Sequence, residues 1–151
     1  MKLNTASSAI SFSRELEDNS ARFYENLIAK YSEAGETWSL FITENQQNKV
    51  LVERAYYGVI SDAIEGCFSF EGIDTGDFAV ETGLTEDGSY ADALNRAAVM
   101  EREIMKFYSA AAQVSRALIG DVARAFDRIV KKRDERIRRL EALSGKGSGG
   151  T

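Results

Sequence analysis

The sequence predicts an all-α fold, a four-helix bundle made of two antiparallel helical hairpins that are joined by a long crossover. Three observations lead to this prediction. The 151 residues include no Pro, so long stretches lack a helix breaker. Apolar residues recur every three or four positions along four segments, which is the spacing of one helix face. Two short connections flank a much longer one, whereas an up-down-up-down bundle needs only short connections.

The first hairpin is predicted to pair a helix over about residues 8–32 with one over about residues 36–65, with a break at Gly35. The core stripe of the first helix consists of Ile10, Glu17, Ala21, Tyr24, Ile28 and Tyr31. The stripe of the second helix consists of Trp38, Phe41, Asn45, Asn48, Val52, Ala55, Val59 and Ala63. Polar residues interrupt both of these apolar faces.

The second hairpin is predicted to begin near Ser89, which precedes Asp92 by three residues in a variant of the capping box. The stripe of its first helix consists of Leu94, Ala97, Glu101, Met105, Tyr108 and Ala112. After a break at Gly120, a last helix is expected to reach about Leu143. Its stripe consists of Val122, Phe126, Ile129, Arg133, Arg136, Leu140 and Leu143.

The connection between the hairpins covers residues 67–87 and is rich in Gly and Asp, so we expect it not to be helical. It still carries apolar residues that need burial, namely Phe68, Phe70, Ile73, Phe78 and Val80. A connection of this length in a compact domain usually has a function. We expect residues 1–144 to form a single domain and the Gly/Ser-rich residues 145–151 to form a flexible tail.

The two halves of the chain repeat each other weakly. Glu17 stands seven residues before Tyr24, and Glu101 stands seven residues before Tyr108, with a Phe directly before each Tyr. The second helices of the two halves also align, residues 38–52 with residues 126–140. Two polar pairs then stand at the same height, Asn45 with Asn48 and Arg133 with Arg136. Each half therefore corresponds to one hairpin with a polar position in its core.

These paired Glu-x6-Tyr segments, together with the crossover, resemble the rubrerythrin branch of the ferritin-like superfamily over about residues 8–143. The resemblance implies a ferritin-like bundle whose first and third helices each carry a Glu about seven residues before a Tyr. It also implies a Glu-x-x-His motif on helices two and four, and two iron ions held by the six ligands. By position, Glu17 and Glu101 correspond to the terminal carboxylates of that site.

The sequence departs from the family pattern at the other ligand positions. Asn45 and Asn48 stand in place of the helix-two pair, and Arg133 and Arg136 stand in place of the helix-four pair. Both imidazole ligands are therefore missing, and the chain contains no His. The resemblance thus points to a degenerate di-iron site.

The register of helix two leaves an alternative. A shift by one residue would place Glu44 and Gln47 at the ligand positions instead of the two Asn residues. We prefer the Asn register because it keeps the apolar residues of helix two in step with those of helix four. The alternative would restore one carboxylate but no imidazole.

The two Arg residues favour a core without a metal. An Arg side chain stays protonated and offers hydrogen-bond donors but no lone pair, so it does not bind a metal ion. We expect the guanidinium groups of Arg133 and Arg136 to replace two metal ions as counter-charges for Glu17 and Glu101. The two Asn side chains would satisfy the remaining hydrogen bonds. Without iron, Tyr24 and Tyr108 on the two stripes would be core residues with hydrogen-bonded hydroxyl groups rather than redox tyrosines.

The leading functional hypothesis is a non-catalytic ferritin-like scaffold for binding or interaction, a homodimer without metal or other cofactor. One alternative is a divergent rubrerythrin-like oxidoreductase, acting on peroxide, oxygen or iron through a residual metal site at Glu17, Glu101 and Glu44. A second alternative is a small-anion site in the Arg/Asn-lined core. The partner would be a protein in the first case and a small anion in the last.

Composition excludes several other classes of function. Without His there is no Ser-His-Asp triad and no His-ligated metal site. Cys67, the only Cys, rules out an internal disulfide and a CxxC redox pair. No apolar run is long enough for a membrane span and the N-terminus has no signal-like apolar region, so we expect a cytoplasmic protein without a membrane partner.

The charge is distributed unevenly along the chain. The net charge of -5 combines +4 in residues 121–151 with -9 in residues 1–120. Asp and Glu are interleaved with the cations of the basic segment at helical spacings. This pattern is typical of a salt-bridged helix face, so we expect no nucleic-acid partner.

Overall fold

The regular elements of the residues described by the structure are all helical. The computed structural model describes residue 3 and residues 5–59, 73–78, 83–84, 88–116 and 120–149. These residues form α1 (Ala6–Lys30), α2 (Gly35–Val59), the short 3-10 helix η1 (Thr75–Phe78), α4 (Tyr90–Ser115) and α5 (Gly120–Gly149). The prediction of an all-α chain with four long helices is confirmed for this part of the chain. None of the described helices combines the length and apolar character that a membrane span requires.

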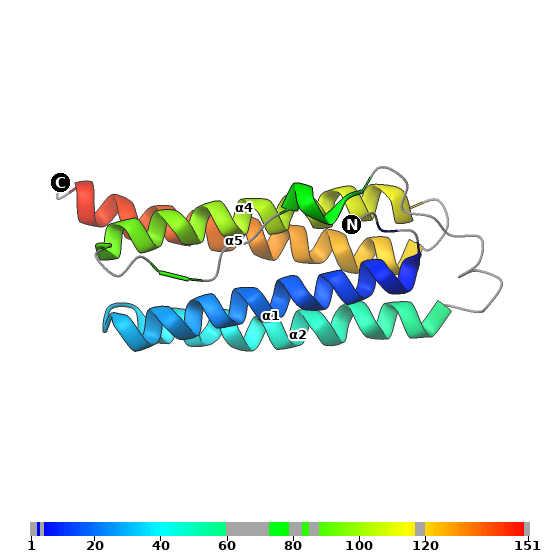
Figure 1. Ribbon diagram of the computed structural model, residues 1–151, viewed down its shortest axis with the longest axis horizontal. Helices are drawn as coiled ribbons and strands as arrows, with labels where there is room; N and C mark the ends of the chain where they lie inside the picture. The colour runs from blue at the N-terminus through cyan, green and yellow to red at the C-terminus, as the bar shows by residue number, and fades with distance from the viewer. Residues whose placement is uncertain are drawn as a thin grey trace.

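The four long helices pack as two pairs. Figure 1 shows α1 beside α2, and α4 beside α5, with the second helix of each pair returning along the first. Contacts between α2 and α5 and between α1 and α4 join the two pairs. The core therefore lies between four helix faces, and residues on all four can meet at one height along the bundle.

Local hydrogen bonds explain where two of the helices begin. Ser89 Oγ accepts the backbone N–H of Asp92 at 3.1 Å, and Asp92 Oδ2 accepts the backbone N–H of Ser89 at 3.1 Å. This capping box confirms the predicted start of α4. A second box, between Thr5 and Ser8, starts α1 two residues before the predicted position. Thr5 thus satisfies N–H groups that the helix leaves without partners.

The turn between α1 and α2 differs from the prediction. Gly35 does not break the helices but is the first residue of α2, and the residue in the left-handed region is Ala34, with φ 57°. The carbonyl of Ala34 accepts the N–H of Trp38, and the indole N–H of Trp38 donates to the carbonyl of Glu33 at 3.0 Å. The buried Trp38 side chain therefore holds the turn in a conformation that an Ala residue rarely adopts.

Replacing Ala34 with Gly is expected to raise the free energy of unfolding by about 1 kcal/mol. A non-Gly residue in the left-handed region costs about 1–3 kcal/mol, and the added freedom of Gly in the unfolded chain offsets about 0.4–1 kcal/mol of the gain. Urea denaturation measures the change. Ala142→Gly, on the exposed side of α5, is the matched control and should lose about 1 kcal/mol. If Ala34→Gly also lowered the free energy of unfolding by about 1 kcal/mol, the inference that Ala34 is strained would be wrong.

The predicted stripes are largely buried, with one clear exception. Ile28 is 40% exposed, because Leu27, at 0% exposure, takes the core position on that turn of α1. One residue corresponds to about 100° around a helix, so Ile28 faces the outer side of α1 and α2. Within the crossover, Ile73 and Phe78 are buried as predicted, and the carbonyl of Ile73 accepts the N–H of Leu3. Cys67, Phe68, Phe70 and Val80 lie outside the described residues, as do residues 60–65, where α2 was predicted to end.

The last helix is longer than predicted. α5 continues to Gly149, six residues beyond Leu143, into the segment that was expected to be a flexible tail. Gly and Ser have low helix propensity, about 1 kcal/mol below Ala for Gly, but they keep the backbone N–H that a helix needs. In the absence of a Pro, the sequence contains no residue that forces the helix to stop.

Candidate functional site

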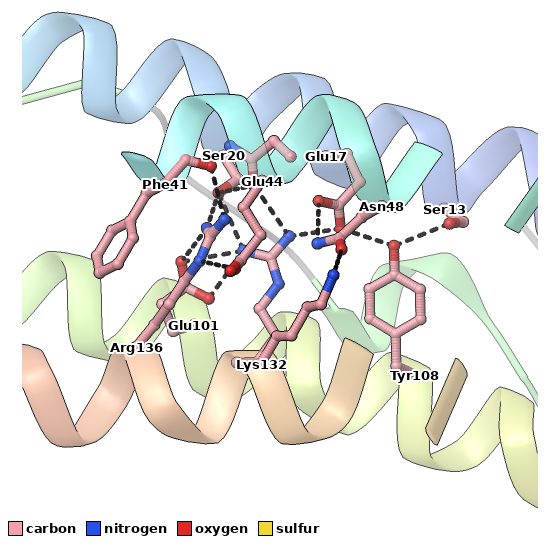
Figure 2. Close-up of polar contacts among 12 residues, drawn as sticks. Ser13, Glu17, Ser20, Phe41, Glu44, Asn48, Glu101, Tyr108, Lys132 and Arg136 are labelled. Carbon is pink, nitrogen blue, oxygen red and sulfur yellow. Dashed lines mark hydrogen bonds and ion pairs between the residues drawn. The ribbon is translucent and has the colours of Figure 1, made fainter. Parts of the chain in front are cut away.

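The polar positions of the four stripes meet in one buried cluster. All six positions predicted from the repeat are present, and none is more than 2% exposed. They are Glu17 on α1, Asn45 and Asn48 on α2, Glu101 on α4, and Arg133 and Arg136 on α5. Figure 2 shows the side chains of these four helices converging, with the carboxylates and guanidinium groups at the centre. We call this set the core ion-pair cluster.

Arg133 joins the two buried carboxylates. Its Nη2 donates to Glu17 Oε2 at 2.5 Å, and its Nη1 donates to Glu101 Oε2 at 2.8 Å and to Glu101 Oε1 at 3.0 Å. The side chains of all three residues have no exposure to solvent. One guanidinium group therefore lies between the carboxylates that the repeat places on opposite hairpins.

Arg136 connects the cluster to the edge of the bundle. Its Nη1 donates to Glu101 Oε1 at 3.1 Å, its Nε donates to Glu44 Oε1 at 2.9 Å, and its Nη2 donates to the carbonyl of Phe41 at 2.7 Å. The guanidinium also lies over the Phe41 ring, 4.7 Å from the ring centre, an arrangement favoured by cation–π attraction. Unlike Arg133, it pairs with only one of the two fully buried carboxylates.

The Asn residues settle the register of α2. Asn48 Nδ2 donates to Glu17 Oε1 at 3.1 Å, and Asn45 Oδ1 accepts from Arg133 Nη2 at 3.4 Å. Gln47, which the alternative register would place in the core, is exposed. Glu44 still contributes to the site, but from the edge, where its side chain is 28% exposed. The structure therefore adopts the preferred register and adds Glu44 to it.

The two repeat tyrosines bond across the repeat. Tyr24 on α1 donates to Glu101 Oε1 on α4 at 2.6 Å, and Tyr108 on α4 donates to Glu17 Oε2 on α1 at 2.7 Å. Tyr108 Oη is also 2.8 Å from Ser13 Oγ. Each hydroxyl thus serves the glutamate of the other hairpin, as expected of core tyrosines with hydrogen-bonded hydroxyl groups.

The surroundings of Glu101, Arg133 and the two repeat tyrosines fix the protonation states of these four side chains. Burial raises the pKa of the Glu101 carboxyl, but Arg133 and Arg136 outweigh burial and hold this pKa below its ordinary value. Burial lowers the pKa of Arg133, but Glu101 and Glu17 outweigh it and hold this pKa well above its ordinary value. Burial raises the pKa of Tyr24 and Tyr108 well above 10, and the neighbouring carboxylates, Glu101 and Glu17 respectively, raise them further. At neutral pH Glu101 and Arg133 are therefore ionised, and the two tyrosines are neutral donors.

Three residues of the site were missed by sequence reasoning. Ser20 Oγ accepts from Arg133 at 3.1 Å and from Arg136 at 3.3 Å, and Ser13 bonds Tyr108. Both serines lie three or four residues from Glu17, on the same face of α1. Their spacing from Glu17 could therefore have predicted that they belong to the site. Lys132 Nζ donates to Asn48 Oδ1 at 3.3 Å from the side of the bundle. No pattern pointed to Lys132, because it precedes a core residue and does not lie on the stripe.

The hydrogen bonding of the cluster is nearly complete. All four oxygens of Glu17 and Glu101 accept at least one hydrogen bond. Two buried donors, Arg133 Nε and Asn45 Nδ2, have no partner within the part of the chain that the structure describes. In the same part of the chain, no group of three or more His, Cys, Asp and Glu side chains is placed to hold a metal ion.

Comparisons of the chain with protein-family models, with curated proteins and with solved structures found no match. We therefore infer the function from the geometry and charge of the cluster.

Proposed function

We propose that the protein is a ferritin-like, rubrerythrin-related bundle in which a permanent set of ion pairs stands in place of a di-iron centre. In this proposal the bundle is a non-catalytic scaffold for binding or interaction. The observation that carries the proposal is the position of the Arg133 guanidinium, which donates to both Glu17 and Glu101 in the centre of the core. These two carboxylates are the ones that the family resemblance assigns to iron.

The charge of the cluster supports this replacement. Arg133 and Arg136 balance Glu17 and Glu101, so the fully buried part of the cluster is formally neutral. A unit charge placed about 4 Å from a guanidinium is repelled by about 4 kcal/mol at an effective dielectric constant near 20. Because a divalent ion carries two unit charges, each Arg would repel it with about twice this energy. It would also have to displace the hydrogen bonds already made by the carboxylate oxygens, so the residues present do not fit a metal ion.

The arrangement of the helices supports the ferritin-like assignment. Two helix pairs are joined through residues 60–89, and each Tyr of the repeat bonds the Glu of the other pair. We also propose that the protein acts as a cytoplasmic homodimer. Support for a dimer comes from Ile28 and Leu40, which are 40% and 60% exposed and line the same surface hollow beside α1 and α2.

The two alternatives receive less support from the geometry. A residual metal site would need Glu17, Glu101 and Glu44, yet each of these carboxylates is paired with an Arg. A small-anion site in the core would need a guanidinium group that is free to bind the anion. Both core Arg residues are instead engaged by carboxylates of the chain itself.

Ferrous iron loading under anaerobic conditions tests the proposal. The full-length chain is dialysed against Fe(II), and bound iron is measured per chain together with the temperature of unfolding. We expect no stoichiometric binding and no stabilisation, because a bound ligand would raise the stability of the folded state. Stoichiometric binding that is lost in Glu17→Gln and Glu101→Gln, but kept in the exposed control Glu135→Gln, would overturn the metal-free core.

A further inference from the structure

A groove on the surface between α2 and α5 collects positive charge. It has a volume of about 440 Å³ and is lined by seven residues. These are Gln46, Gln47, Val50, Leu51 and Arg54 from α2, and Arg128 and Lys132 from α5. The groove thus contains three cations and two amide side chains, and no carboxylate is among its lining residues. It lies outside the core ion-pair cluster, although Lys132 touches both.

Several cations elsewhere on α4 and α5 are paired with carboxylates. Arg124 pairs with Asp121, Arg138 pairs with Asp134, and Arg116 on α4 pairs with Asp127 of α5. In contrast, Arg54 and Arg128 make no hydrogen bond or ion pair within the described residues. Within the described part of the chain, these two cations therefore lack a carboxylate partner, and they lie together on a protein whose net charge is -5.

Lys132 adds a donor that is already oriented. Its Nζ donates to Asn48 Oδ1 at 3.3 Å, and Figure 2 shows its side chain lying against Asn48 at the edge of the cluster. An ammonium group has three N–H donors, so two remain for a ligand. Asn48 in turn donates to Glu17, which anchors it to the buried core. Lys132 is thereby held at the groove by a rigid part of the bundle.

The remaining lining residues complete a site for an anion. Each Arg offers a planar fork of donors that matches two oxygens of a phosphate or carboxylate group. The amide groups of Gln46 and Gln47 can donate to the same oxygens. Val50, which is 44% exposed, and the partly buried Leu51 provide an apolar surface beside the cations. The groove therefore suits a small molecule with an oxyanion group and an apolar part.

We propose that this groove binds a polyvalent oxyanion, with Arg54, Arg128 and Lys132 as the charged ligand-binding residues. The shared chemistry is a phosphate or polycarboxylate group on a small molecule. The inference goes beyond the scaffold function, and it does not depend on whether the core is free of metal.

Isothermal titration calorimetry with inorganic pyrophosphate tests the proposal, on the full-length chain at constant ionic strength. We expect saturable binding at one site, and binding at least about tenfold weaker in the double variant Arg54→Gln/Arg128→Gln, since two charge-assisted contacts are removed. The double variant Arg22→Gln/Arg102→Gln is the matched control, because it removes the same charge from exposed positions away from the groove. Its affinity should be unchanged.

Two further measurements make the result specific. Citrate in place of pyrophosphate distinguishes the sources: binding of both identifies a general oxyanion site, and binding of pyrophosphate alone identifies a phosphate site. The side-chain amide NMR signals of Gln46 and Gln47 should shift on binding. The absence of saturable binding of either anion, or equal weakening in the two double variants, would overturn the proposal. The core remains testable separately by iron loading, so the two failures are distinguishable.

Discussion

Replacing Arg133 with Met is expected to lower the free energy of unfolding by about 3–5 kcal/mol, the usual cost of removing one partner of a buried ion pair. Met fills part of the space of the aliphatic stem but leaves Glu17 without a cationic partner in a site with 0% exposure. Glu101 retains Arg136 at 3.1 Å. Urea denaturation at pH 7 measures the loss, since the slope should be unchanged while the midpoint falls.

A surface pair provides the control for this experiment. Arg138 pairs with Asp134, and both side chains are well exposed, at 78% and 45%. Arg138→Met should therefore cost less than about 0.5 kcal/mol. Adding Glu17→Gln to Arg133→Met should recover part of the loss, because the unpaired charge is then removed as well. If Arg133→Met cost no more than Arg138→Met, the central role of Arg133 in the core ion-pair cluster would be refuted.

The positions of the cluster residues could be predicted because helix periodicity decides which residues face the core. Glu17, Glu101 and Arg133 each interrupt an apolar stripe, and a polar residue on a buried face needs a buried partner. The charges then indicate the pairing, since two Arg and two Glu residues at one height neutralise each other. The structure places these residues together as the sequence predicted. Whether the bundle descends from a di-iron protein stays a prediction.

The features of the fold and site that could not be predicted depend on the length of individual side chains and on local backbone geometry. Glu44, a candidate only in the alternative register and the residual metal site, and Lys132, which no pattern indicated, both lie beside the stripes. Their long side chains bring the charged ends into contact with Arg136 and Asn48. Periodicity describes Cβ directions and does not describe where such a side chain ends. The left-handed conformation of Ala34 was also not predicted, because Gly35, next to it, is the residue type that favours this conformation. The turn is instead held by the buried Trp38, whose indole N–H donates to the carbonyl of Glu33.

The cross-bonding of the tyrosines follows from the direction of the helices. Seven residues of α-helix span about 10 Å, so a Tyr hydroxyl is displaced along the axis from the Glu of its own helix. Figure 1 shows α1 and α4 running in opposite directions. Opposite direction places the Tyr of each helix level with the Glu of the other, which is the pairing observed for Tyr24 with Glu101 and for Tyr108 with Glu17. The repeat therefore encodes two equivalent bonds.

The double variant Tyr24→Phe/Tyr108→Phe is expected to lose about 1.5–3 kcal/mol for each hydroxyl, because each donates to a buried carboxylate. The loss should depend on pH. In the unfolded chain a Tyr ionises near pH 10, whereas both pKa values are raised well above 10 in the folded protein. The stability that these tyrosines contribute is therefore fully present below about pH 10 and decreases as the pH rises, by up to about 1.4 kcal/mol per pH unit for each Tyr.

Urea denaturation of the wild type and the double variant between pH 8 and pH 11 separates the loss of the two hydrogen bonds from the effect of tyrosine ionisation. The stability gap between them should be constant below about pH 10 and should narrow above it, because only the wild type must keep two buried hydroxyl groups protonated. Tyr57→Phe is the control, since the Tyr57 side chain is 71% exposed and a change there leaves both buried bonds intact. A gap that stayed constant up to pH 11 would mean that the tyrosine hydroxyls are not sequestered with the carboxylates. The cross-bonded pairs would then have to be open to solvent, contrary to the ion-paired core.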